Sequence, residues 1–456
     1  MAIFFLNDIN MNCGERIICF LPTKQSQHFP EDEYIMICKL VSNKINEFRE
    51  VMISTKEITT ISQKLNEISD VIMNCVEYPK EIFIIPEIFL GCQTLLLSNN
   101  LNIIQNAIRF LSLAIYSTSN LSESLSDLYP LIFNISETKS EILIKRYFSL
   151  ITNIFSDLKE NHNYTLIDQL ITTYFADLFN YISNLISITI YEETLIFLNA
   201  LSSLITSEKY CEYYLQLTSF LITLLNDQRI QYSENFQSII LWSLTENCKH
   251  NKSEFSNITL SLNFLPFLVE SIDTFQSCCI EPVLSILYFC VDFLKSADFI
   301  SSKNLPILVH FSTSSNIHIQ FDSLRLLRVL IQFYPSEFLS LNLNEVINFF
   351  NQVQFRSSKE IFMIASSLVF YMPDSLVMAE NSIIQQLIEF IIQNINFDEE
   401  SPKSALLSLL KIKEKFVKFG KLKSFQNILN QFESIEELTE NQSDEVLDLI
   451  DKVTST

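Results

Sequence analysis

The stretch IIQNAIRFLSLAI, residues 103–115, decides the fold class of this chain. Its apolar residues recur every three or four positions and so fall on one broad face of a helix: Ile103, Ile104, Ala107, Ile108, Leu111 and Ile115. Isoleucine favours strands, but a period of 3.6 residues outweighs that preference. The same spacing returns over Glu141–Ile154, Glu192–Ile205 and Ile317–Ile331, each bounded by Ser, Asn, Asp or Pro. The sequence therefore predicts an all-α protein.

Glycine is almost absent, which supports the same conclusion. The 456 residues include three glycines, Gly14, Gly91 and Gly420, where an average chain of this length carries roughly 32. Phosphate-binding loops and dinucleotide fingerprints need several glycines within one turn, so both are excluded. Tight turns of β-rich folds also use glycine, and the chain has no Asn-Gly or Asp-Gly hairpin signal.

The helical pattern itself repeats along the chain. One core position was taken from each longer apolar helix: Leu111, Leu150, Leu198, Trp242, Leu287, Leu327, Leu368 and Leu409. Successive positions are 39 to 48 residues apart, with a mean of about 43. Shorter helices are expected between them, for example over 260–272 and 305–312. Units of this length stack on their neighbours to bury their apolar faces, which predicts an armadillo/HEAT-type α-solenoid, a right-handed superhelix of about eight to nine repeats.

The two ends of the chain differ from this array. Residues 1–60 are predicted to form a loop over Cys13–Glu31 and a capping helix over Tyr34–Met52, followed by the repeat array over 61–432. Residues 433–456 are expected to form an acidic capping repeat or tail, with eight acidic groups between 433 and 451. A polar outer surface is what a terminal repeat requires.

Composition excludes several classes of function. With 31 basic and 53 acidic residues the net charge is −22, which argues against nucleic acid as a partner and favours basic ones. The longest apolar stretch noted, Ile82–Leu97, is too short and too polar to span a bilayer. Ten scattered cysteines without a C-x-x-C pair, and five histidines, give no metal-ligand spacing and suit a reducing compartment. No nucleophile motif is present, so catalysis is not expected. No cofactor is expected either.

Two stretches carry a family resemblance: residues 239–334, in three segments, and residues 435–451. ILWSLTENCKHNKSEF (240–255), LSLNFLPFLVESID (260–273) and LPILVHFSTSSNIHIQFDSLRLLRVLIQ (305–332) resemble the armadillo array of importin-alpha, the adaptor that reads nuclear localisation signals. IEELTENQSDEVLDLID (435–451) resembles its closing repeat. In that family, Trp and Asn residues four positions apart on successive helices stack on the lysine stems of a peptide and hold its backbone. The resemblance implies an armadillo fold, basic peptide ligands and an importin-beta-like carrier or export factor as partners.

The resemblance suggests four peptide-binding residues in this chain. Trp242 would stack on a basic side chain, and Glu246 and Asn247 would accept lysine and peptide N–H groups. Arg325 would meet an acidic partner, or pair with a carboxylate of a neighbouring repeat. Trp242 is the only tryptophan, the residue four positions later is Glu246, and the basic N-terminal arm of the family is missing.

The function expected from the sequence is non-catalytic protein binding in the cytoplasm, the nucleus or both. The first hypothesis is a divergent nuclear-import adaptor that holds basic signals in an acidic concave groove. The alternative is a general scaffold or regulatory subunit that has lost signal binding and docks a folded partner through the concave face of the solenoid. An inner face lined with aromatic residues and carboxylates favours the adaptor, and an apolar or charge-neutral face favours the scaffold.

Overall fold

The computed structural model describes residues 30–54, 57–73, 76–134, 140–341, 347, 350–379, 382–430 and 443–454. These residues form helices joined by turns, and no strand is found among them. The predicted loop before Glu31 and the first part of the predicted acidic tail, up to residue 442, lie outside this set. The chain divides into two compact units, Met1–Asn247 and Cys248–Thr456, which are described separately.

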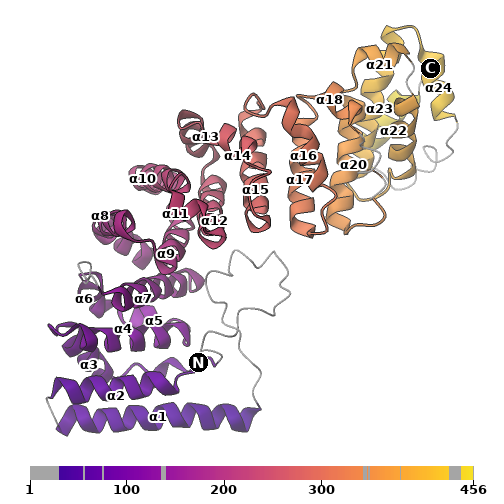
Figure 1. Cartoon of the computed structure of the whole chain (residues 1–456). Helices are drawn as coiled ribbons and strands as arrows, with labels where there is room; N and C mark the ends of the chain where they lie inside the picture. Colours follow the sequence, from indigo (N-terminus) through magenta and orange to yellow (C-terminus); the bar gives the residue numbers. More distant parts are fainter. Residues whose placement is uncertain are drawn as a thin grey trace. The chain divides into compact units, whose positions relative to one another are not determined.

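The first unit is a series of helices that pack on one another in chain order. Figure 1 shows α1, α2, α4 and α7 side by side, and each packs on the next, as α7 does on α9. The elements are α1 (Glu31–Ser54), α2 (Ile58–Val71), η2 (Lys80–Ile82), α3 (Pro86–Leu96), α4 (Leu101–Tyr116), α5 (Leu121–Ser124), η3 (Ser126–Leu128), α6 (Tyr129–Phe133), α7 (Glu141–Glu160), α8 (Tyr164–Ile188), α9 (Glu192–Ser202), α10 (Ser207–Leu225), α11 (Gln228–Gln231) and α12 (Glu234–His250), whose last three residues belong to the second unit.

The second unit continues the same construction. Here α15, α17, α20, α23 and α26 pack successively, with shorter helices between them. The elements are α13 (Lys252–Ser261), α14 (Phe264–Glu270), α15 (Ser277–Leu294), η4 (Ser302–Asn304), α16 (Leu305–Phe311), α17 (Ile317–Leu330), α18 (Pro335–Ser340), α20 (Phe355–Phe370), α21 (Asp374–Ala379), α22 (Ser382–Gln393), α23 (Ser401–Lys418), α24 (Leu422–Leu429) and α26 (Asp444–Thr454).

The repeat period read from the sequence places one core position on each of eight helices, four in each unit's series. The eight core positions fall one each on α4, α7, α9, α12, α15, α17, α20 and α23. Trp242 is 8% exposed and the other seven are at most 1% exposed. We call these eight helices, together with α2, the repeat helices. The chain thus has an all-helical, repeat-like fold in which each helix buries its apolar face against its neighbours.

Asparagine marks where several of these helices begin. The Asn100 side chain accepts a hydrogen bond from the N–H of Asn102 at the start of α4, and Asn251 and Asn316 cap α13 and α17 in the same way. Such caps satisfy backbone donors that the first helical turn leaves unpaired.

One predicted helix is divided in two. The expected helix over 260–272 is instead the end of α13 followed by α14, because Asn263 between them adopts a left-handed conformation with φ of 54°. Asparagine tolerates this conformation better than most residues, and it interrupts the helical hydrogen bonding. The predicted helix over 305–312 corresponds to α16.

Candidate functional site

Neighbouring repeat helices of the first unit are joined by polar side chains. Each of these bonds links positions 41 to 44 residues apart, close to the repeat period, and two of them join α4 to α2, one joins α7 to α4 and one joins α9 to α12. The pairs are Asn106 Nδ2 to Ser62 Oγ at 3.0 Å, Arg109 to Asn66 Oδ1 at 2.6 Å, Asn153 Nδ2 to Ser112 Oγ at 3.1 Å and Asn199 Nδ2 to Ser243 Oγ at 3.2 Å. We call the side chains in these bonds, together with Arg146 and Ser149 on α7, the polar stripe. Its members are Ser62, Asn66, Asn106, Arg109, Ser112, Arg146, Ser149, Asn153, Asn199 and Ser243.

Several positions of the polar stripe are only half-buried. Arg146, Ser149 and Asn153 are of this kind on α7, and they are separated by three and four residues. That spacing keeps them on one face of the helix. The stripe therefore combines bonds that hold the repeat together with side chains that solvent or a ligand reaches.

Trp242 and Asn247 are both buried. Trp242 is 8% exposed, and Asn247 is fully buried. The Asn247 amide donates to Thr218 Oγ1 at 3.1 Å, and its backbone carbonyl accepts from the Tyr214 hydroxyl at 2.8 Å. The side chain thus joins α12 to α10 inside the unit, whereas the sequence suggested that it would hold a peptide.

Glu246 lies one turn after Trp242 on α12 and is half-buried. Burial lowers the pKa of Lys159 on α7, and the negative charge of Glu246 acts in the opposite direction. Lys159 also donates to Ser203 Oγ on the α9 side at 2.9 Å. The Glu246 carboxylate is therefore within electrostatic range of a lysine of the same unit, so a basic ligand would share it.

Arg325 lies in the second unit, on α17, and contacts an aromatic cluster. Its guanidinium carbon is 3.9 Å from the centre of the Tyr288 ring, 5.4 Å from that of Phe321 and 5.8 Å from that of Phe289. Its NH1 is 3.5 Å from Asp322 Oδ1, one turn earlier on the same helix. The sequence offered a carboxylate of a neighbouring repeat as one partner, and here the neighbouring repeat contributes the Tyr288 ring instead.

Two buried carboxylates accompany this cluster. Asp322 accepts a 2.5 Å hydrogen bond from Ser285, and Glu360 Oε2 lies 3.3 Å from Arg328 Nε. Burial raises the pKa of both carboxyl groups, and the neighbouring arginines reduce that rise. Arg328 on α17 and Glu360 on α20 thus form an ion pair between neighbouring repeats, the kind of pairing that the sequence offered for Arg325.

Two further arginines, which the sequence analysis did not select, meet in the first unit. Arg109 on α4 pairs with Asp70 on α2 at 2.7 Å, and Arg146 on α7 lies close enough to Arg109 for their charges to interact. The sequence signal was a basic residue inside an otherwise apolar helix in two successive repeats. That signal alone does not show which of the two has a carboxylate partner.

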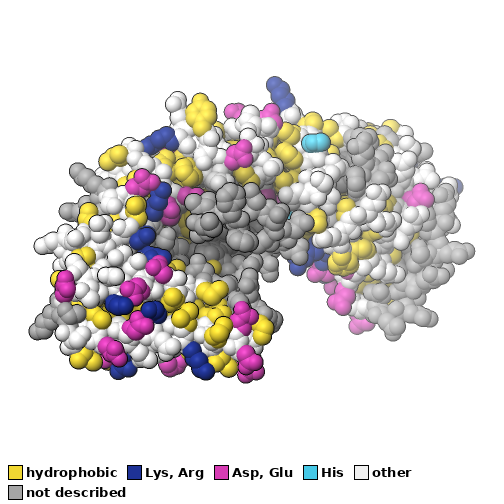
Figure 2. Space-filling model, turned by 60° about the horizontal axis from the view of Figure 1, so that its bottom comes forward, with side chains coloured by type: hydrophobic (Ala, Val, Ile, Leu, Met, Phe, Trp, Pro, Cys, Tyr) yellow, Lys and Arg dark blue, Asp and Glu magenta, His cyan; other side chains and the backbone are white. Residues whose placement is uncertain are grey.

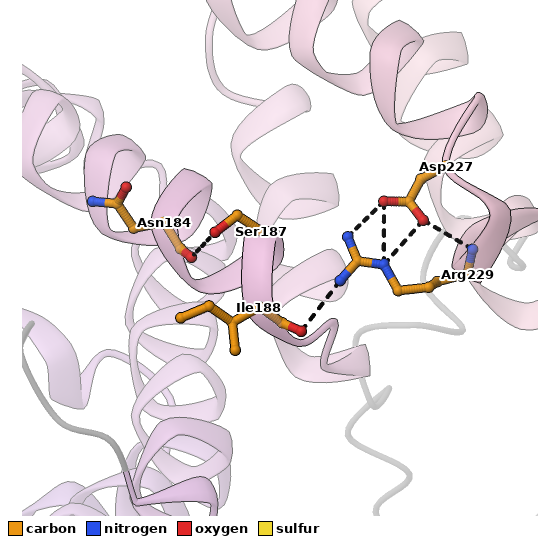
Figure 3. A network of polar contacts seen from close by, with 5 residues as sticks. All are labelled: Asn184, Ser187, Ile188, Asp227 and Arg229. Carbon is orange, nitrogen blue, oxygen red and sulfur yellow. Dashed lines mark hydrogen bonds and ion pairs between the residues drawn. The ribbon is translucent and has the colours of Figure 1, made fainter.

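Arg229 shows what a fully paired arginine looks like in this unit. Its guanidinium lies against the Asp227 carboxylate at 2.6 Å (NH2 to Oδ2) and 3.0 Å (Nε to Oδ1), and NH1 donates to the Ile188 carbonyl at 3.3 Å (Figure 3). Hydrogen bonding to Arg229 lowers the pKa of Asp227. Two parallel hydrogen bonds make this a bidentate pair.

The charges visible on the surface are mixed. Figure 2 shows acidic, basic and hydrophobic side chains interspersed on the face that it presents. On α1 and α2, Lys44, Glu47, Lys64 and Glu67 form a network in which the closest contact, Lys64 to Glu67, is 2.7 Å.

Among the described residues, no three His, Cys, Asp or Glu side chains are grouped to hold a metal ion.

One described helix, α15, is long and apolar enough to cross a membrane by length and composition. This helix lies outside Ile82–Leu97, the apolar stretch that the sequence excluded as a membrane span. In the structure 67% of α15 is buried inside the fold, as expected for a core helix. We therefore assign α15 to the core of the second unit.

Comparisons with known proteins support the fold and nothing more specific. No protein-family model and no curated protein matches the chain. Among solved structures, one engineered protein matches with a TM-score of 0.63 and 12% identity, covering 91% of this chain and 97% of its own. A second engineered protein matches with a TM-score of 0.38 and 14% identity, covering 52% of this chain and 94% of its own. The first match shows a common helical fold across most of the chain.

Proposed function

We propose that this chain is a non-catalytic protein-binding scaffold that holds an extended segment of a partner against the polar stripe of its repeat helices. The observation that carries the proposal is the recurrence of that stripe. Half-buried polar side chains lie on three successive helices, Asn66 on α2, Arg109 on α4 and Asn153 on α7, so an extended chain lying across them has its backbone and side chains within reach of three repeats. Of the two functions expected from the sequence, this is the scaffold, with an extended segment as its ligand in place of a folded partner.

For the fold, we propose the armadillo-type right-handed superhelix of about eight to nine repeats. Support comes from the eight anchor positions, which fall one each on eight helices, from the packing of such helices on one another within each unit, and from the shorter helices between them. The mean period of about 43 residues lies within the range of armadillo and HEAT units.

The second candidate is the import adaptor that holds basic signals and uses an importin-beta-like carrier. One observation favours it: Trp242 and Glu246 lie one turn apart on α12. Against it, Asn247 is buried and bonded to Thr218, Trp242 is only 8% exposed, and Arg325 already occupies the Tyr288 ring. This candidate is therefore ranked second.

A blocking substitution tests the scaffold. Peptides that bind the folded chain are selected from a random display library, and their affinity is measured for wild type and for Ser149→Tyr, which places a bulky ring on the polar stripe. The matched control is Ser183→Tyr on α8. Like Ser149, Ser183 is half-buried and donates to the carbonyl four residues earlier.

We expect Ser149→Tyr to weaken the selected peptides at least tenfold and Ser183→Tyr to leave them within twofold. Failure to select any peptide, or equal affinity for both variants and wild type, would contradict the scaffold. A fluorescent Lys/Arg-rich signal peptide, tested at two salt concentrations against wild type and Glu246→Gln, tests the adaptor. Salt-sensitive binding that Glu246→Gln weakens would support it.

A further inference from the structure

Arg146 is a half-buried cation without a carboxylate partner among the residues that the structure describes. Its NH1 makes one long contact, 3.5 Å to the carbonyl oxygen of Gln105 on α4. A guanidinium has five N–H donors. Most of its donor capacity is therefore unused by the part of the chain that the structure describes.

The neighbouring charges do not compensate Arg146. Arg109 is held on the other side of α4 by Asp70 at 2.7 Å and Asn66 at 2.6 Å. Lys145, next to Arg146 on α7, pairs with Glu141 at 2.8 Å. Burial lowers the pKa of Arg146, and the positive charge of Arg109 lowers it further. One uncompensated positive charge therefore remains at this place on the polar stripe.

An unpaired, partly desolvated cation is unfavourable for the free protein. The chain has 53 acidic and 31 basic residues, yet no described carboxylate forms an ion pair with Arg146. The bidentate pair of Arg229 and Asp227 shows what the same side chain forms when a carboxylate is present. Arg146 has the donors for such a pair and lacks the acceptor.

We propose that Arg146 receives a carboxylate from an Asp/Glu-rich extended segment of a partner protein. The inference rests on the proposed scaffold function and specifies the chemistry of its partner. A carboxylate supplies the two acceptors that a guanidinium fork pairs with most strongly. Ser149 and Asn153, at the following positions of the same face of α7, supply polar contacts to the next part of the segment.

The spacing of the helices fits an extended segment. Packed helices are about 8–10 Å apart, which corresponds to about three residues of extended chain. A segment crossing from α4 to α7 therefore places a second acidic side chain, two or three residues from the first, near Arg109. There it shares Arg109 with Asp70, whose side chain is 56% exposed.

The test uses the full chain and a fluorescein-labelled peptide of alternating Glu and Ser as the probe. Affinity is measured by fluorescence anisotropy, and the arginine side-chain Nε–H signals are followed by NMR, which also detects weak binding. Arg146→Gln removes the charge, and Arg146→Lys keeps it without the fork. Arg229→Gln on the same unit removes an equal charge from a paired arginine and is the matched control.

We expect Arg146→Gln to weaken the acidic peptide at least tenfold, Arg146→Lys to weaken it less, and Arg229→Gln to change it less than twofold. The Nε–H signals of Arg146 and Arg109 should shift on binding, and that of Arg229 should not. The thermal midpoint of Arg146→Gln should equal or exceed that of wild type, because an uncompensated cation is removed. A lower midpoint would indicate that Arg146 serves the fold instead, and would overturn the assignment.

Other outcomes separate the two proposals. If library-selected peptides bind in a way that Ser149→Tyr blocks, but the Glu-Ser peptide does not bind, the scaffold stands and the acidic partner is rejected. Binding of the Glu-Ser peptide that Arg146→Gln leaves unchanged also rejects Arg146. A phosphoserine peptide that binds where the Glu-Ser peptide fails would reject the carboxylate as the ligand.

Discussion

The guanidinium carbon of Arg325 lies 3.9 Å from the centre of the Tyr288 ring, so a cation of the chain itself occupies an aromatic surface between α15 and α17. The ring face is negative in its quadrupole and attracts the guanidinium. Because the site is occupied, a basic ligand would first have to displace Arg325. The contact thus contributes to packing between repeats in the second unit.

Arg325→Met should lower the free energy of unfolding by about 1–3 kcal/mol. It removes a partly desolvated cation–π contact and also the positive charge nearest to the buried Asp322. Urea denaturation would measure the change. In the double variant with Asp322→Asn the loss should be smaller than the sum of the two single losses. Arg229→Met, which breaks a surface pair, should cost less than about 1 kcal/mol; an equal loss in both variants would refute the special role of Arg325.

Glu360→Gln should alter how stability depends on pH. Burial raises the pKa of Glu360 in the folded state, so its contribution to stability is present at low pH and is lost as pH rises through the folded pKa. Glutamine does not titrate. The thermal midpoint of the variant relative to wild type should therefore be higher at pH 7.5 than at pH 4.5. Glu337→Gln, at an exposed position, is the control and should show no such difference.

Asn247→Ala should destabilise the first unit by about 1–3 kcal/mol. The substitution removes the amide that bonds Thr218 and leaves the Thr218 hydroxyl without that partner in a buried place. Thr218→Val should lower the free energy of unfolding by a similar amount. The double variant should lose less than the sum of the two single losses. Asn184→Ala on the exposed side of α8 should change stability by less than about 0.5 kcal/mol. Unchanged stability of Asn247→Ala would instead support a ligand-binding role.

Gly91→Ala should be destabilising although it lies inside helix α3. An alanine there normally stabilises a helix by up to about 1 kcal/mol. A Cβ at Gly91, however, would lie 2.5 Å from Cζ of Phe48, whose side chain is fully buried. We expect a net loss of about 1–3 kcal/mol from overpacking. Phe48→Leu should lower the stability less in the Gly91→Ala background than in wild type, and calorimetry would measure both losses. A net gain in stability for Gly91→Ala would contradict the packing argument.

The sequence specified the helices because the information needed for each helix is local. The 3.6-residue period at Ile103–Ile115 and the asparagines that precede α4 and α17 are read within a few residues. Even the repeat of about 43 residues depends only on the spacing of core positions. The division at Asn263 was missed because a left-handed residue between two apolar segments leaves no strong pattern.

The candidate site depended on the tertiary structure. The sequence could identify Asn247 and Arg325 as unusual residues, but each has a neighbour 29 or 37 residues away that decides what it does: Asn247 meets Thr218, and Arg325 meets Tyr288. Arg109 and Arg146 are alike in sequence, and only packing gives Asp70 to the first and leaves the second without a carboxylate among the described residues. Periodicity determines which face of a helix is buried, because it is a property of one helix. Which polar group is paired depends on the neighbouring helix, so only the folded chain decides it.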